Sequence, residues 1–162
     1  MKKRRNTDKN FPLWQYLLGG GILLTVLTFS GLSILFVAQR PYQLAQDQLV
    51  QLARQSADVA QVDHFDIFNG KKTYDSLLGK NSQGQEVAVL KEDKGDKLYV
   101  YELDKGTSQS QAEQVATNNG AGQIDRATFG MLDDKPIWEV KSGTAYYIVD
   151  FETGALTSKE GL

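Results

Sequence analysis

The chain of 162 residues contains no cysteine and only one histidine, His64. These absences exclude disulfides, iron–sulfur sites and thiol catalysis, and one histidine cannot complete a typical zinc site. Neither a Gly-x-Ser-x-Gly motif nor a phosphate-binding glycine loop before a helix is present. We interpret His64 as an ordinary strand residue, although Asp63 and Asp66 beside it leave open a surface enzyme with a polar pocket. We therefore expect no catalytic residue, no metal site and no cofactor.

Basic residues are also scarce over most of the chain. Residues 41–162 carry 12 Lys and Arg against 19 Asp and Glu, a net charge of −7. Residues 1–12 are the opposite, with five cations and a single acid, Asp8. A region as acidic as 41–162 offers no basic stripe for phosphates, so we expect no nucleic-acid partner.

Residues 13–38 form a run of 26 residues without any charge. As a helix this run is about 39 Å long, and a bilayer core is roughly 30 Å thick. A cleaved signal peptide is the alternative. The run is longer than the apolar core of such a peptide, and it carries Phe36 at a position where a cleavage site needs a small residue. We predict a single transmembrane helix at 13–38 in the cell membrane. The basic tail 1–12 is then cytoplasmic and residues 41–162 are extracellular, because positive charge stays inside.

Two amphipathic helices are expected outside the span. Apolar residues recur at spacings of three and four from Tyr42 to Ala60, which predicts a stalk helix after a break or kink at Pro41. Ser110 and Glu113 have the spacing of a capping box and predict the start of a second helix. Asn118-Asn119-Gly120 ends that helix.

Short alternating runs separated by turn residues predict two groups of strands around the second helix. Asn69-Gly70 predicts a two-residue hairpin turn between the first two strands. The cluster of Glu92, Asp93 and Asp96 is interpreted as a solvated hairpin loop, because it lacks EF-hand spacing. The expected strands are 65–68, 72–78, 85–91, 97–103, 123–132, 136–141, 144–151 and 155–157.

The two groups of strands resemble each other in sequence. Residues 98–106 match residues 146–154 at an offset of 48, each with an apolar strand, an acid and then a glycine four residues later. Asp150 is expected to accept backbone N–H groups within a turn, and Gly106 and Gly154 to supply the positive φ that closes it. The preceding strands match at an offset of 50. This pattern favours two tandem modules, with chance similarity of β patterns as the alternative.

The segments 136–140, 146–150 and Thr153-Gly154 resemble the end of a PepSY-type module. The whole arrangement resembles the TseB-like (YpmB-like) family of Gram-positive bacteria. The resemblance implies an α+β fold with a transmembrane helix, a stalk helix and two cystatin/PepSY-like modules at 41–106 and 107–162. Each module would be a helix packed on a small antiparallel sheet.

The same resemblance implies a function. Members of this family are membrane-anchored, non-enzymatic regulators of cell-wall elongation that act with a penicillin-binding protein. PepSY modules elsewhere are linked to protease inhibition, so an extracellular protease inhibitor or processing modulator is the alternative. The oligomeric state stays open.

Aromatic residues supply the expected partner-binding positions. Because successive strand residues point to opposite faces and one helix covers only one face of a small sheet, some rings must lie at a module contact or on the surface. Aromatic side chains are also favoured as interface anchors, whereas Trp138 is expected in the core. The predicted partner-binding residues are Tyr99, Tyr101, Tyr146 and Tyr147.

Overall fold

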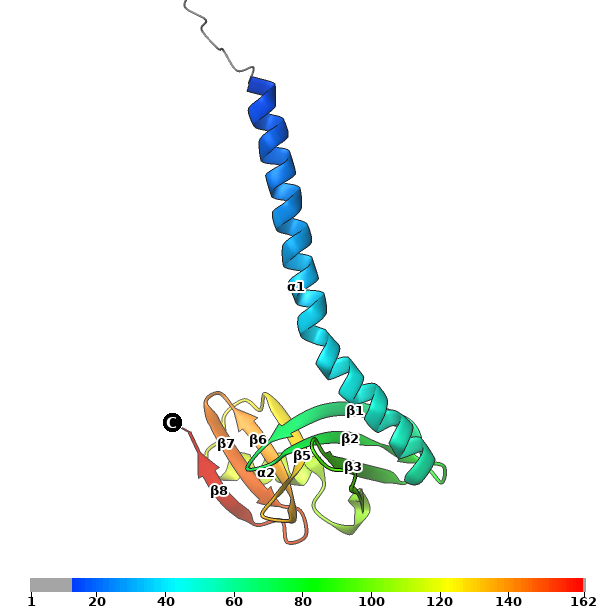
Figure 1. The fold of residues 1–162 in the computed structure, drawn as a ribbon. Coiled ribbons are helices and arrows are strands. Elements are labelled where there is room, and N and C mark those ends of the chain that lie inside the picture. The colour runs from blue at the N-terminus through cyan, green and yellow to red at the C-terminus, as the bar shows by residue number, and fades with distance from the viewer. Residues whose placement is uncertain (1–12, 162) are drawn as a thin grey trace, which may run out of the picture. The chain divides into compact units, whose positions relative to one another are not determined.

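The computed structural model describes residues 13–161, and the chain divides into two compact units, Met1–Gln43 and Leu44–Leu162. The fold is α+β, as predicted, with one long helix followed by two antiparallel sheets (Figure 1). The first sheet has the order β1-β2-β3-β4 and the second β5-β6-β7-β8. The elements are α1 (Leu13–Ser56), β1 (Val59–Asn69), β2 (Thr73–Asn81), β3 (Glu86–Glu92), β4 (Leu98–Glu102), η1 (Leu103–Lys105), α2 (Gln109–Asn118), β5 (Arg126–Leu132), β6 (Lys135–Ser142), β7 (Ala145–Asp150) and β8 (Leu156–Glu160).

Helix α1 continues through Pro41, so the chain has no break there, and the other predicted possibility, a kink at Pro41, stays a prediction. A proline removes only one backbone donor from a helix, and the residues on either side keep their helical conformation. The helix ends at Ser56 and not near Ala60 as predicted. Asp58 adopts the left-handed conformation with φ of 53°, which stops the helix and turns the chain into β1.

The N-terminal part of α1 exposes its apolar side chains. Leu17, Ile22, Phe29 and Ile34 are each more than half exposed, and Trp14 lies at the start of the helix. Within residues 13–161, α1 is the one helix long and apolar enough to cross a membrane.

The first sheet is an antiparallel meander whose first turn differs from the prediction. Asn69 still pairs with Thr73, and residues 70–72 form a three-residue loop. The predicted two-residue turn at Asn69-Gly70 is therefore wrong. Gly70 has another reason to be glycine, because a Cβ atom there would lie 2.7 Å from the Cε1 atom of the Phe68 ring.

The second sheet contains the tight two-residue turns. Leu132 pairs with Lys135, which leaves Asp133 and Asp134 as the turn residues, with φ of 50° and 61°. A turn of this length with two positive φ angles matches the right-handed twist of the flanking strands. Short polar side chains such as Asp tolerate these angles better than other non-glycine residues. The Asp133-Asp134 pair is therefore part of a turn.

The capping box of helix α2 begins two residues earlier in the chain than predicted. The capping residues are Ser108 and Gln111, not Ser110 and Glu113. The Gln111 backbone N–H donates to Ser108 Oγ at 3.3 Å, and the Ser108 backbone N–H donates to Gln111 Oε1 at 2.9 Å. Both pairs of residues have the three-residue spacing of a capping box, and the pair that comes first in the chain caps the helix. Gly120, with φ of 95°, follows the helix, as the sequence indicates.

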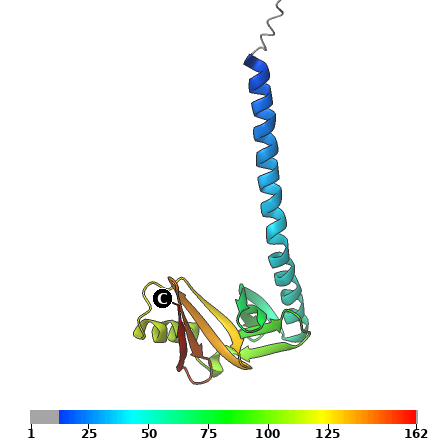
Figure 2. The ribbon, with the colours of Figure 1, turned by 60° about the vertical axis from the view of Figure 1, so that its left-hand side comes forward.

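Within residues 44–162 the first sheet is covered on both faces. Leu49 and Ala53 of α1 are fully buried against one face, next to Leu77 and Val89. The opposite face contributes to a larger core together with the second sheet and α2. Figure 2 shows α2 beside the second sheet. Both sheets therefore belong to one packed body.

The structural repeat differs from the repeat seen in the sequence. Each sheet follows a helix and contains four consecutive strands, so β4 corresponds by position to β8. The sequence match at an offset of 48 instead places β4 on β7, the third strand of its sheet. Alternation of apolar residues is shared by all these strands, and it cannot distinguish a third strand from a fourth. The module boundary at 106/107 stays a prediction.

Candidate functional site: a groove where the two sheets meet

Aromatic rings join the two sheets. The Tyr101 ring of β4 lies 5.6 Å from the Phe129 ring of β5 and 6.0 Å from the Phe151 ring, measured between ring centroids. The Phe129 ring is also 5.0 Å from the ring of Trp138, nearly perpendicular to it. Edge-to-face contacts at these distances are favourable beyond the area that they bury. The sheets therefore share an interlocked core.

The segment between β4 and α2 is tied to the second sheet by buried hydrogen bonds. Trp138 Nε1–H donates to the Thr107 carbonyl at 2.7 Å, and the Thr107 N–H donates to the Phe151 carbonyl at 2.7 Å. Gly106 lies so close to Phe151 that a Cβ atom would come within 2.6 Å of the Phe151 carbonyl oxygen. These contacts fix the position of the segment that links the sheets.

A polar contact holds β1 against β5. Thr128 Oγ1 donates to Asp66 Oδ2 at 2.6 Å, and Arg126 Nη1 lies 3.5 Å from Asp66 Oδ1. Beside it, the Phe68 ring lies on the backbone of Gly130, where any Cβ atom would overlap the ring. A hydrogen bond to a charged group in a half-buried site is stronger than a neutral one. The relative position of β1 and β5 is thus set by charge and by close packing.

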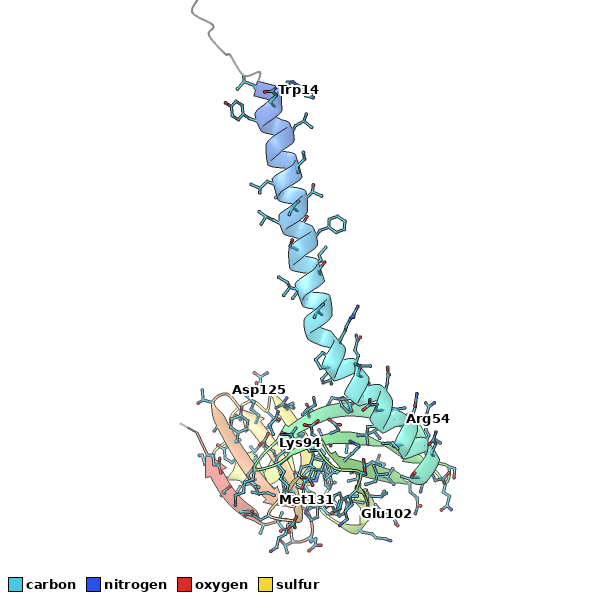
Figure 3. The ribbon with its side chains drawn as sticks, viewed as in Figure 1. Trp14, Arg54, Lys94, Glu102, Asp125 and Met131 are labelled. Atoms are coloured by element: carbon cyan, nitrogen blue, oxygen red, sulfur yellow. The ribbon has the colours of Figure 1, made fainter. Side chains whose placement is uncertain are left out.

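A groove of about 510 Å³ opens next to this junction. Its walls come from β1, β2, the turn into β3, η1 and the start of α2, and Trp138 of β6 lies at its base. Glu102, labelled in Figure 3, is the last residue of β4 and directly precedes the η1 wall. The lining residues are Asp63, His64, Leu78, Gly79, Gln85, Glu86, Leu103, Asp104, Ser108, Gln109 and Trp138.

The groove has an apolar base and an acidic rim. Trp138 is fully buried, and Leu78 and Leu103 are half-buried. Asp63, Glu86 and Asp104 are exposed, and none of them forms an ion pair within 4 Å in the described part of the chain. Among residues 13–161, no Lys or Arg lines the groove. Its chemistry favours a ligand that is apolar in part and positively charged in part.

His64 lies on the rim of this groove, on β1 and opposite Leu78. The structure places Asp63 next to it but shows no hydrogen bond to the imidazole from the described residues. Asp66 points elsewhere, toward Thr128. Among residues 13–161, no group of three or more His, Asp or Glu side chains is arranged to hold a metal ion. The flanking acids therefore do not form a proton-transfer set with His64.

The four tyrosines predicted to bind a partner lie in different surroundings. Tyr147 is only 1% exposed, so its ring belongs to the core. Tyr101 is half-buried at the sheet junction, where burial raises the pKa of its phenol. Tyr99 stands edge-on to Tyr74 with Lys97 Nζ 4.5 Å from its ring centroid. Tyr146 is half-buried, with Lys141 Nζ 5.9 Å from its ring centroid. The four do not form one patch, and their partner-binding role stays a prediction.

The Asp150 turn forms as expected. The Thr153 N–H and hydroxyl both donate to Asp150 Oδ1 at 2.8 Å, and Gly154 has φ of 71°. The hydrogen bond from the Thr153 backbone N–H is the main cause that holds the pKa of Asp150 below its usual value. The expectation for Gly106 is wrong: its φ is −150°, an extended conformation that follows the short helix η1.

Glu139 is a half-buried acid on the strand that pairs with the strand of Asp150. It lies on β6 opposite Ile148, whereas Asp150 lies opposite Ile137, so the two carboxylates are two positions apart along the sheet. Burial raises the pKa of Glu139, and the nearby Arg126 opposes that shift. Asp150 is engaged in its turn, so the pair forms no acid–base site.

A comparison with known protein families finds a match within the first sheet. Residues 50–90 match the model of a family described as the cell wall elongation regulator TseB-like domain. This segment is similar to the TseB-like domain. It includes β1, β2 and most of β3, and it supplies Asp63, His64 and Glu86 of the groove. The predicted resemblance to the TseB-like family is thereby confirmed, and the match supports a role related to the cell wall.

The fold is also that of a solved structure. The YpmB protein from Bacillus subtilis superposes with a TM-score of 0.63 and 24% identity, over 72% of this chain and 96% of that one. A protein from Clostridium difficile described as a candidate lipoprotein gives a TM-score of 0.38 and 12% identity, over 72% of this chain and 91% of that one. No curated protein sequence matches the chain significantly. The likeness to YpmB confirms the fold beyond the TseB-like segment.

Proposed function

We propose that the protein is a membrane-anchored, non-enzymatic regulator of cell-wall elongation that acts by binding a cell-wall synthesis protein, a penicillin-binding protein in the first instance. The observation that carries this proposal is the TseB-like match over residues 50–90. The groove supports a binding role, because it combines an apolar base with exposed carboxylates that form no ion pair in the described part of the chain. Two tandem modules, 41–106 and 107–162, would present this binding surface.

The membrane anchor is part of the same proposal. The apolar side chains exposed between Leu13 and Val37 would be unfavourable in water and match the length of a bilayer core. With the basic tail inside, residues 41–162 lie outside the cell membrane. An anchor of this kind raises the effective concentration of a weak binder near a membrane partner, so modest affinity suffices.

Photo-crosslinking in intact cells tests this function. A photoreactive amino acid replaces one exposed residue at a time in residues 44–161, at Val100, Asp104, Gln114 or Thr157, which lie on different elements. We expect at least one position to give an adduct with a penicillin-binding protein or another cell-wall synthesis protein, identified by mass spectrometry and confirmed from the partner's side. An adduct with a secreted protease would instead support the inhibitor alternative. Absence of any cell-wall synthesis protein from the adducts of all four positions would contradict the proposal.

A further inference from the structure

We infer that the groove at the sheet junction binds an extended basic peptide segment of a protein partner, with a Lys or Arg side chain held between carboxylates and a neighbouring apolar side chain on the base. This inference rests on the proposed function, because it names the chemistry of the partner segment. It concerns the groove only, and it can fail while the partner binding itself stands.

The shape of the groove fits a short peptide segment. Its volume of about 510 Å³ lies in the usual range for ligand sites, roughly 300–1,000 Å³. Leu78 and Leu103 offer apolar surface over the buried ring of Trp138. Long basic side chains also bury their methylene stems on such surfaces while the charged group stays near water. The base therefore suits both an apolar side chain and the stem of a Lys or Arg.

The negative charge of the groove favours a positively charged ligand. Asp63, Glu86 and Asp104 stand around it as exposed carboxylates, and Asp63 accepts only a neutral hydrogen bond, from Gln61 Nε2 at 2.5 Å. No nearby cation forms an ion pair with them among the described residues. Lys105 is bonded to Glu102 at 2.8 Å, and Lys80 lies opposite Glu86 across the sheet without an ion pair within 4 Å among the described residues. An acidic peptide or a phosphate would be repelled here.

The groove is also held open before any ligand arrives. The buried bond from Trp138 Nε1–H to the Thr107 carbonyl fixes the base against the linking segment. The capping box of Ser108 and Gln111 fixes the start of α2 on one wall. A preformed site loses little conformational freedom on binding, so a short segment can bind with useful affinity.

Other ligand classes fit the groove less well. A bare metal ion would need converging ligands, and no group of three or more ligating side chains is arranged for one among residues 13–161. Nucleic acid and anionic lipid carry the same sign of charge as the rim. A small organic cation would leave most of the apolar base uncovered. A peptide that alternates basic and apolar residues covers both the rim and the base.

The test uses the full chain in nanodiscs of zwitterionic lipid, which do not attract a basic probe. The probe is a fluorescent octapeptide in which Lys or Arg alternates with Leu. Fluorescence anisotropy measures its binding to the parent chain, to the groove variant D63N/E86Q/D104N, and to the matched control D93N/D96N/E152Q. The control removes the same charge from exposed acids that do not line the groove.

We expect the groove variant to bind the peptide about tenfold more weakly, since three exposed charge contacts are lost. The control variant should stay within about twofold of the parent, and a peptide with Glu in place of its basic residues should not bind. Equal weakening in both variants would mean general attraction to an acidic surface and would overturn the inference. Unchanged binding by the groove variant, or equal binding of the Glu peptide, would overturn it as well.

A second readout needs no variant. A photoreactive leucine analogue in the peptide should attach to residues of β1, β2, η1 or α2 that line the groove, as peptide mapping would show. Attachment confined to the β8 edge or to α1 would overturn the inference. If crosslinking in cells still captures a cell-wall synthesis protein while the peptide test fails, only the groove assignment is wrong. If the peptide binds but no such protein is captured, the proposed function is wrong.

Discussion

Replacing Gly130 by alanine is expected to lower the free energy of unfolding of residues 44–162 by about 3 kcal/mol, and the melting temperature by roughly 10 °C. A Cβ atom on Gly130 would overlap the Phe68 ring, with 2.5 Å to Cδ2 and 2.8 Å to Cδ1. The ring is almost fully buried between the two sheets and cannot swing away without opening the junction. Thermal unfolding of the full chain in detergent, followed by circular dichroism, measures the effect.

Gly122→Ala is the matched control for this prediction. A Cβ atom on Gly122 would meet only Ser142 Oγ, at an ordinary distance of 3.8 Å, so the same change should be nearly neutral. Replacing the Phe68 ring by the smaller side chain of leucine (Phe68→Leu) should reduce the loss of unfolding free energy caused by Gly130→Ala, because the two changes act on the same contact. If the Gly130→Ala variant unfolds at the same temperature as the parent chain, β5 does not pack closely on β1 at this position.

Replacing Trp138 by phenylalanine is expected to lower the free energy of unfolding by about 2–4 kcal/mol. The change removes the buried Nε1–H donor, so the Thr107 carbonyl loses its partner at 2.7 Å. It also leaves a small void beside the Phe129 ring, which packs edge-on against Trp138 at 5.0 Å. An unsatisfied buried acceptor and a cavity each destabilise the fold, and their effects add at this site.

The chain contains its own control for this change, since it has only two tryptophans. Trp14 is 61% exposed on α1 and outside the unit formed by residues 44–162. Trp14→Phe should therefore leave the unfolding of that unit unchanged. Chemical denaturation of both variants, followed by circular dichroism, compares them directly. Equal stability of the two variants would show that Trp138 does not tie the linking segment to the second sheet.

The sequence predicts the fold class and the order of its elements, because apolar alternation follows from burial of one strand face. Strands such as β3 and β6 lie within one or two residues of their predicted positions. The Asp150 turn is also predicted correctly, since its hydrogen bonds join residues three or four apart in the chain. Structural features that are determined by residues close together in the sequence are therefore well predicted.

Predictions fail where contacts distant in sequence decide between local alternatives. Asn69-Gly70 has the signature of a two-residue turn, yet the Phe68 ring occupies the space beside Gly70. Gly106 resembles Gly154 in sequence, but it is glycine because Phe151 of the second sheet approaches its backbone. The sequence carries no signal for either contact, because both depend on packing that only the folded chain creates.

The groove illustrates the same limit for function. Its rim acids come from three separate places, Asp63 on β1, Glu86 at the start of β3 and Asp104 in η1. No spacing rule links them, and each alone looks like an ordinary exposed acid. The excess of acidic over basic residues in 41–162 is the sequence feature that points to the groove's ligand. It favours a positively charged partner segment, but it does not indicate where that segment binds.

The most direct test of the account is an exchange of the membrane segment. Residues 13–38 are replaced by an unrelated apolar helix of equal length, and the mean cell length of a strain that lacks the natural chain is measured with this variant as the only copy. We predict that the variant restores cell length, because in the proposed function the binding surface lies in residues 44–162 and the helix only holds it at the membrane. A variant that is inserted in the membrane at the parent's level but fails to restore cell length would contradict the account.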